Sequence, residues 1–199
     1  MTRSSFTSRF RAVALGASLL SLPLAASAQT SAGGTPPPGG VPTTAPAATP
    51  RPLAGADKKF VKDASSSLFY LLDLLKAAKT SATGETTKKV FETGNKELTS
   101  AWEGVAKIST AKNEKLVTEL GNSDKQNTAK LKKAAPDKFD KEFLKDYSKE
   151  LKKLAGVYEA ASKSVQDPEI KAYTLTWIPT LTNLFTEADK AESEAGKRK

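Results

Sequence analysis

The stretch FLKDYSKELKKLAGVYEAASKSV, residues 143–165, carries apolar side chains along one side of a predicted helix. They recur at steps of three and four residues, and Lys, Glu and Ser fill most of the positions between them. This period, close to 3.6 residues, is that of an amphipathic α-helix with one buried face. The residues of that face are Phe143, Tyr147, Leu151, Leu154, Tyr158, Ala161 and Val165.

Three other stretches have the same rhythm, at residues 60–75, 91–108 and 170–191, and no stretch shows convincing strand alternation. The sequence therefore predicts an all-α protein, a bundle of four long helices. The apolar stripes are Phe60, Ala64, Leu68, Leu71 and Leu75 in the first, Phe91, Gly94, Leu98, Ala101, Val105 and Ile108 in the second, and Ile170, Tyr173, Trp177, Leu181, Leu184, Ala188 and Ala191 in the last.

Shorter elements are expected between the second and third long helices. We expect one short helix around Glu114–Leu120 and another over Asp124–Ala134. The run Asp167-Pro168-Glu169 supplies an N-cap, a proline for the first helical position and an acid near the positive end of the helix dipole, so it starts the last helix. The predicted bundle domain covers residues 56–199.

The N-terminus has the pattern of a secretory signal peptide at residues 1–28. A polar start with three arginines precedes the apolar run AVALGASLLSLPLA at 12–25, and Ala26-Ser27-Ala28 resembles a cleavage site. We expect export, cleavage after Ala28, and a mature protein in the periplasm or cell envelope. The alternative is an uncleaved N-terminal anchor.

Residues 29–55 form a segment rich in Pro, Gly, Thr and Ala. Seven of the eleven prolines of the chain and one charge, Arg51, lie here. Such a composition cannot bury enough apolar surface to offset its ordering entropy, so we expect a disordered linker. A solvated spacer and a glycosylated or cell-wall-threading segment are both open readings.

The composition excludes several kinds of chemistry. The chain has no Cys and no His, so it has no disulfide, no acylated cysteine, and neither the commonest general base nor the commonest transition-metal ligand. Its glycines form no phosphate-binding loop, and no motif for nucleophilic catalysis is present. We therefore expect no enzyme activity, no catalytic or cofactor-binding residue and no cofactor.

The formal charge of +9 raises the question of an anionic partner. Glu142, Asp146 and Glu150 are interleaved with lysines at helical spacing, so pairs such as Asp146 with Lys149 would make an ordinary charged face. The other reading is contact with an anionic envelope polymer or a membrane surface. Nucleic acid is not expected, because export removes it and no aromatic–basic motif appears. The lysines are Lys130, Lys132, Lys133, Lys138, Lys141, Lys145, Lys149, Lys152 and Lys153.

Three passages resemble domain-of-unknown-function family 4142, exported ferritin-like bacterial proteins. They are DKKFV at 57–61, FDKEFL at 139–144, and DPEIKAY at 167–173 followed by IPTL at 178–181. The resemblance covers about residues 57–191 and implies a ferritin-like four-helix bundle. It also implies histidines facing the bundle interior, where ferritin-like proteins hold metal.

The positions that match those histidines are Leu98, Leu151 and Leu184, and a family acid would fall near Leu71 or Asp73. We therefore expect ordinary core, no metal residue, and a non-catalytic binding or structural module. The alternative is a ferritin-like metal-binding or redox protein that uses carboxylates only. Its candidate ligands for a hard cation are Glu97, Glu150 and Glu187, which flank the apolar stripes.

Overall fold

The computed structural model describes residues 52–197, and every regular element within them is an α-helix. The long helices are α1 (Gly55–Ser81), α2 (Glu85–Ala111), α4 (Pro136–Ser164) and α5 (Pro168–Lys197). The short helix α3 (Asn122–Lys132) comes between α2 and α4. The predicted all-α bundle with a short helical insert is confirmed.

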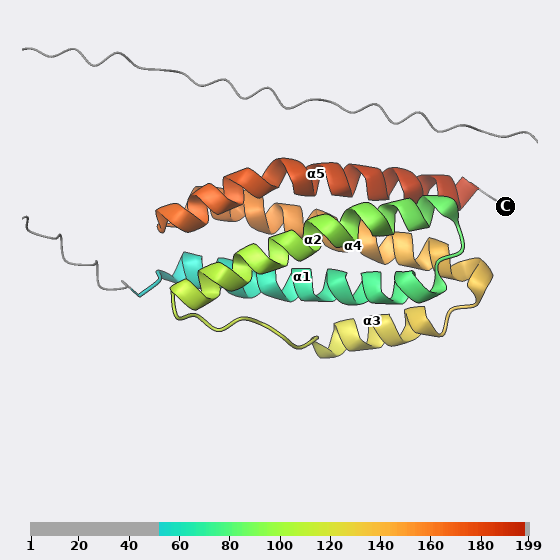
Figure 1. The fold of residues 1–199 in the computed structure, drawn as a ribbon, viewed down its shortest axis with the longest axis horizontal. Helices are drawn as coiled ribbons and strands as arrows, with labels where there is room; N and C mark the ends of the chain where they lie inside the picture. Colours follow the sequence, from blue (N-terminus) through green and yellow to red (C-terminus); the bar gives the residue numbers. More distant parts are fainter. Residues whose placement is uncertain (1–51, 198–199) are drawn as a thin grey trace, which may run out of the picture. The chain divides into compact units, whose positions relative to one another are not determined.

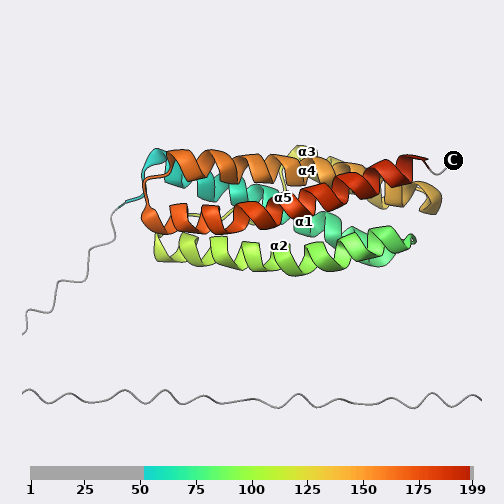
Figure 2. The same cartoon turned by 90° about the horizontal axis from the view of Figure 1, so that it is seen from above.

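The four long helices lie side by side (Figures 1 and 2). Around the bundle they follow the order α1, α2, α5, α4, and α3 packs outside them against α1 and α4. Short connections at 82–84 and 165–167 make α1–α2 and α4–α5 antiparallel pairs. The connection from α2 to α4 runs back along the bundle through α3, so α2 and α4 point the same way (Figure 1).

The predicted short helix at Glu114–Leu120 is wrong, because this segment has no helix. An isolated helix of that length is marginal in water, and tertiary contacts here favour an extended chain. The Val117 N–H donates to Ser65 Oγ of α1 at 3.1 Å, and Glu114 pairs with Lys58 of α1 at 3.0 Å. The other predicted short helix corresponds to α3.

The predicted signal peptide at 1–28 and most of the predicted linker at 29–55 lie outside the described residues. At the end of that linker, Leu53 is 6% exposed and belongs to the hydrophobic core. The packed bundle therefore begins slightly before the predicted boundary at residue 56.

Two glycines of α2 allow tyrosines from other helices to approach its backbone. A Cβ at Gly94 would lie 2.0 Å from the Tyr147 hydroxyl oxygen of α4, and one at Gly104 would lie 2.5 Å from the Tyr173 ring of α5. Tyr173 also donates a hydrogen bond of 2.6 Å to the Ala101 carbonyl of α2. Helix α2 therefore needs residues without a side chain at these two positions.

We predict that Gly104→Ala lowers the free energy of unfolding by about 1–3 kcal/mol through overpacking against Tyr173. The matched control is Gly156→Ala in α4, where nothing lies within 4 Å of an added Cβ. That change should raise stability by up to about 1 kcal/mol, because alanine favours a helix more than glycine does. Urea unfolding measures both variants. Equal stability gains would show that α2 and α5 are less closely packed than described.

Candidate functional site

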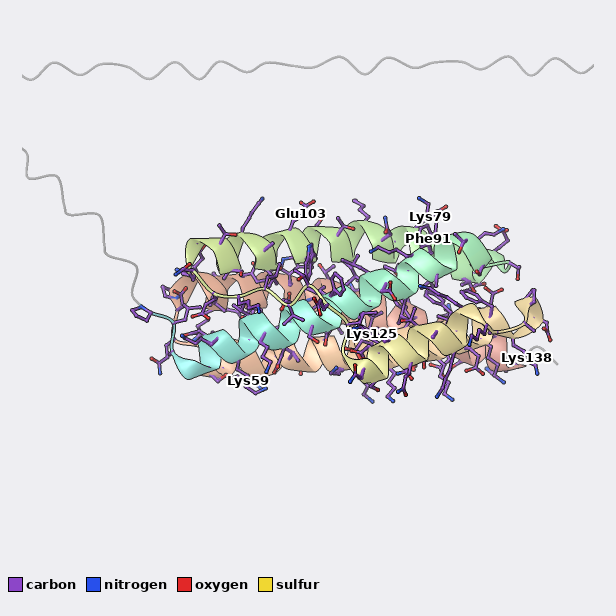
Figure 3. The ribbon with its side chains drawn as sticks, turned by 90° about the horizontal axis from the view of Figure 1, so that it is seen from below. Lys59, Lys79, Phe91, Glu103, Lys125 and Lys138 are labelled. Atoms are coloured by element: carbon purple, nitrogen blue, oxygen red, sulfur yellow. The ribbon has the colours of Figure 1, made fainter. Side chains whose placement is uncertain are left out.

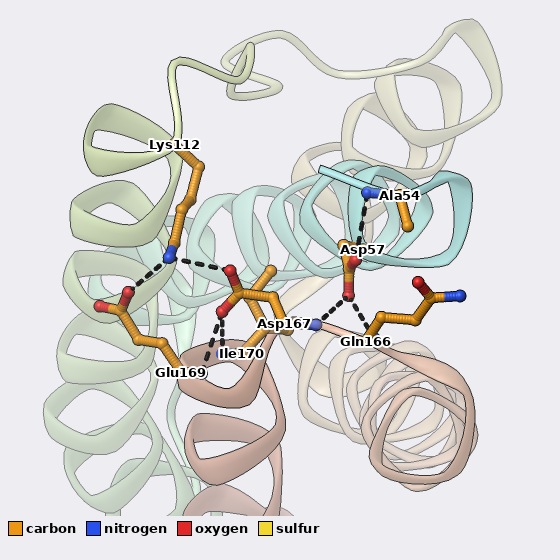
Figure 4. A network of polar contacts seen from close by, with 7 residues as sticks. All are labelled: Ala54, Asp57, Lys112, Gln166, Asp167, Glu169 and Ile170. Carbon is orange, nitrogen blue, oxygen red and sulfur yellow. Dashed lines mark hydrogen bonds and ion pairs between the residues drawn. The ribbon is translucent and has the colours of Figure 1, made fainter. Parts of the chain in front are cut away.

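Each of the three passages that carry the family resemblance contains an aspartate. The one in the first passage, Asp57, joins the start of α1 to the turn between α4 and α5 (Figure 4). Its side chain is 1% exposed. Asp57 Oδ1 accepts hydrogen bonds from the backbone N–H groups of Gln166 at 2.9 Å and Asp167 at 3.2 Å, and Oδ2 accepts one from Ala54 at 3.2 Å. A buried carboxylate needs such partners to offset its lost hydration. Asp57 is therefore a structural group that ties together distant parts of the chain.

Asp167, from the last of these passages, caps α5 and connects it to the end of α2 (Figure 4). Its Oδ1 accepts the backbone N–H groups of Glu169 at 2.9 Å and Ile170 at 3.2 Å. Lys112 Nζ lies 2.8 Å from Asp167 Oδ2 and 2.9 Å from Glu169 Oε2. The predicted N-cap is confirmed, and the structure adds a partner from another helix.

The charge of Asp167 favours the folded state above acid pH. Burial alone would raise the pKa of its carboxyl group, but hydrogen bonds from Lys112, Ile170 and Glu169 outweigh burial and hold the pKa below its ordinary value of 3.8. A carboxyl group whose pKa is lower in the folded state stabilises the fold at pH values above its unfolded-state pKa. This stabilisation is lost as the pH falls through the folded-state pKa. This connection therefore weakens in acid.

Asp140, from the passage at residues 139–144, accepts hydrogen bonds from a helix start at the opposite end of the bundle. Its Oδ2 accepts hydrogen bonds from the Gly84 N–H at 2.7 Å and the Thr83 hydroxyl at 2.8 Å, and its Oδ1 accepts the Thr83 N–H at 3.3 Å. These donors lie at the start of α2, where backbone N–H groups lack partners within the helix. All three passages that carry the resemblance thus contribute a carboxylate that holds helix ends.

The interior positions that match the family's histidines are filled with core. Leu98 and Leu151 are 0% exposed and Leu184 is 5% exposed, which confirms their predicted burial. Leu71 is also fully buried, while Asp73 is half-buried and its Oδ2 has no hydrogen-bond partner among the described residues. Leucine supplies no lone pair to a metal, so these residues do not fit the metal site that the resemblance implies.

The three candidate carboxylates of the alternative reading have different surroundings. Glu150 is 8% exposed and its Oε1 lies 2.9 Å from Lys153 Nζ. Glu97 is partly exposed at 3.6 Å from Lys96 Nζ, and Glu187 is exposed. Among residues 52–197, no three His, Cys, Asp or Glu side chains are grouped so that they could hold a metal ion. The structure does not bring these glutamates together as a ligand set.

The bundle interior contains a tyrosine hydroxyl whose surroundings the sequence does not predict. Tyr147 is 0% exposed, and its hydroxyl has no hydrogen-bond partner among the described residues. Burial raises the pKa of this hydroxyl, with a smaller effect from the charge of Glu187. The sequence placed Tyr147 on the buried stripe, but its position against Gly94 depends on how α2 and α4 meet.

The lysines that suggested an anionic partner are all exposed (Figure 3 labels Lys138). Within residues 52–197, Lys153 is the only one of the nine in an ion pair. The expected pair of Asp146 with Lys149 is not among these contacts. Asp146 is half-buried, and burial is the main cause of its raised pKa. Eight of these nine lysines therefore have no ion-pair partner among the described residues.

We predict that Tyr147→Phe leaves the free energy of unfolding unchanged or raises it by up to about 1–3 kcal/mol, the cost of an unsatisfied buried hydroxyl. The matched control is Tyr173→Phe, which removes the bond to Ala101 and should lower stability by about 0.5–1.5 kcal/mol. Chemical denaturation of both variants measures the difference. A clear loss of stability in Tyr147→Phe would mean that this hydroxyl has a partner in solution.

Comparison with known proteins supports the family resemblance of the sequence. No helix within residues 52–197 is long and apolar enough to cross a membrane. No curated protein and no solved structure matches the chain. A family model described as a domain of unknown function, DUF4142, matches residues 42–191, which is well over half of the sequence. The chain therefore belongs to the DUF4142 family.

Proposed function

We propose that the mature chain is a non-catalytic, exported cell-envelope protein whose helical bundle serves as a binding or structural module. The observation that carries this proposal is the complete burial of Leu98 and Leu151, with Leu184 close to it. These leucines occupy the positions where the resemblance would put metal ligands. An apolar interior is stable without a metal, whereas interior imidazoles would need partners.

The site of action proposed for this module is the periplasm or cell envelope. The support is the signal-peptide pattern at residues 1–28, with cleavage after Ala28. The Pro-rich segment at 29–51 would then separate the bundle from the new N-terminus. Export also removes nucleic acid as a partner.

The partner proposed for the bundle is an anionic envelope polymer or an anionic membrane surface. The nine lysines named above are exposed, and all but Lys153 lack an ion-pair partner among the described residues. Such a surface attracts polyanions and releases their counterions on binding. The described residues contain no arginine, so the bidentate recognition typical of guanidinium groups is not available there.

We predict substoichiometric metal in protein purified from the native host without chelators and then dialysed. Elemental analysis by mass spectrometry measures this, and the intact mass of the same sample checks that the chain begins at Gln29. The matched comparison is the triple variant Leu98→His, Leu151→His, Leu184→His, which should acquire zinc or cobalt if the three positions converge.

Two results would contradict the proposal. Stoichiometric metal that survives dialysis of the wild-type protein would favour the alternative, a metal-binding or redox protein that uses carboxylates. The triple variant Glu97→Gln, Glu150→Gln, Glu187→Gln would then lose that metal. A mature species that still begins at Met1 would overturn the proposed cleavage.

A further inference from the structure

Five exposed lysines follow a single line along α4. They are separated by steps of three, four, four and three residues, which return to one side of a helix. The buried residues of α4, such as Phe143, Tyr147 and Leu154, lie on the other side. We call this set the lysine rail: Lys138, Lys141, Lys145, Lys149 and Lys152.

Lysines of the rail have both lysines and acids at neighbouring positions, since Glu142 lies four residues after Lys138 and three before Lys145. Lys141 and Lys145 are four residues apart, as are Lys145 and Lys149, and like charges at this spacing destabilise a helix by roughly 0.2–0.5 kcal/mol per pair. None of the five forms an ion pair within the part of the chain that the structure describes. Lys152 lies over the Phe185 ring of α5 at 5.9 Å.

Some lysines of other helices are paired with acids. In α1, Lys59 pairs with Asp63, and in α2, Lys88 pairs with Glu85 at 2.9 Å. The acids closest in sequence to the rail, Asp146 and Glu142, form no ion pair with it among the described residues. Burial raises the pKa of Asp146, although the charges of Lys145 and Lys149 act to lower it. The five lysines of the rail therefore form no ion pair among the described residues, although acids lie at suitable spacing on the same helix.

The shape of the rail favours a linear partner. At a rise of about 1.5 Å per residue, its five lysines span about 21 Å, with roughly 4.5–6 Å between neighbours along the axis. A lipid surface would instead favour apolar side chains that insert beside the charges. Within residues 52–197, the only strongly exposed large apolar side chain is Leu175, and it belongs to α5.

We propose that the lysine rail of α4 binds a linear polyanion, with its phosphate or carboxylate groups laid along the helix axis. This inference rests on the proposed function, since it specifies which anionic partner the bundle takes and where. The partner neutralises the row of like charges and releases the polymer's counterions. Because lysine acts as a point charge, the contact depends on the spacing of the anions more than on their chemical identity.

The test compares two variants of the mature full-length protein that lose the same charge. The rail variant carries Lys→Gln at 138, 141, 145, 149 and 152. The control variant carries Lys→Gln at five exposed positions elsewhere, 79, 89, 107, 171 and 190. The probes are fluorescent polyphosphate, poly-L-glutamate, and vesicles of phosphatidylglycerol in phosphatidylcholine, titrated at several salt concentrations.

We expect the wild-type and control proteins to bind both polymers with similar affinity. The affinity of the rail variant should be lower by at least about tenfold. We also expect a shallower dependence of log K on log salt for the rail variant, because only contacting lysines release counterions. The melting temperature of the rail variant should equal or exceed that of wild type, since like-charge repulsion is removed.

Equal losses in both variants would show that binding follows net charge, which overturns the rail and leaves the proposed function standing. Binding to vesicles without binding to either polymer would overturn the proposal that the rail binds a linear polyanion. An anionic membrane surface would then remain as the proposed partner. Binding of the wild-type protein to none of the three probes would overturn the rail and the proposed anionic partner together.

Discussion

The buried carboxylate of Asp57 is the contact on which one whole end of the bundle depends. It receives backbone N–H groups from Gln166 and Asp167, more than one hundred residues further along the chain. A charge with 1% exposure is tolerated only with such donors. Asp167 in turn caps α5 and holds Lys112 at the end of α2. One short network therefore sets where α1, α2, α4 and α5 meet.

The polar groups of the described residues are divided between helix ends, the interior and the surface. Asp57, Asp140 and Asp167 are occupied by helix ends, and leucines fill the middle of the bundle. The Tyr147 hydroxyl remains inside without a partner among the described residues, next to the α2 backbone at Gly94. Among the described residues, the lysines without an ion pair are exposed, and five of them follow one line along α4.

The sequence alone predicted what depends on periodicity. The 3.6-residue rhythm indicates which side of each long helix is buried, and the burial of Leu98, Leu151 and Leu184 follows from it. The predicted stripe residues Phe91 and Trp177 are only partly buried. The rhythm could not find partners distant in sequence, such as those of Asp57 or Asp140, nor separate the buried Glu150 from the exposed Glu187. The segment at 114–120 was mistaken for a helix because its extended form depends on Ser65 of α1.

The most direct test of the central role of Asp57 is the stability of Asp57→Ala against that of Asp63→Ala, measured by urea unfolding at neutral pH. Asp63 lies in the same helix, is partly exposed and pairs with Lys59, so its loss should cost less than about 1 kcal/mol. Loss of Asp57 removes charge-assisted bonds and leaves three part-buried N–H groups without this partner, which should cost about 3 kcal/mol or more. Equal and small losses in the two variants would contradict this account.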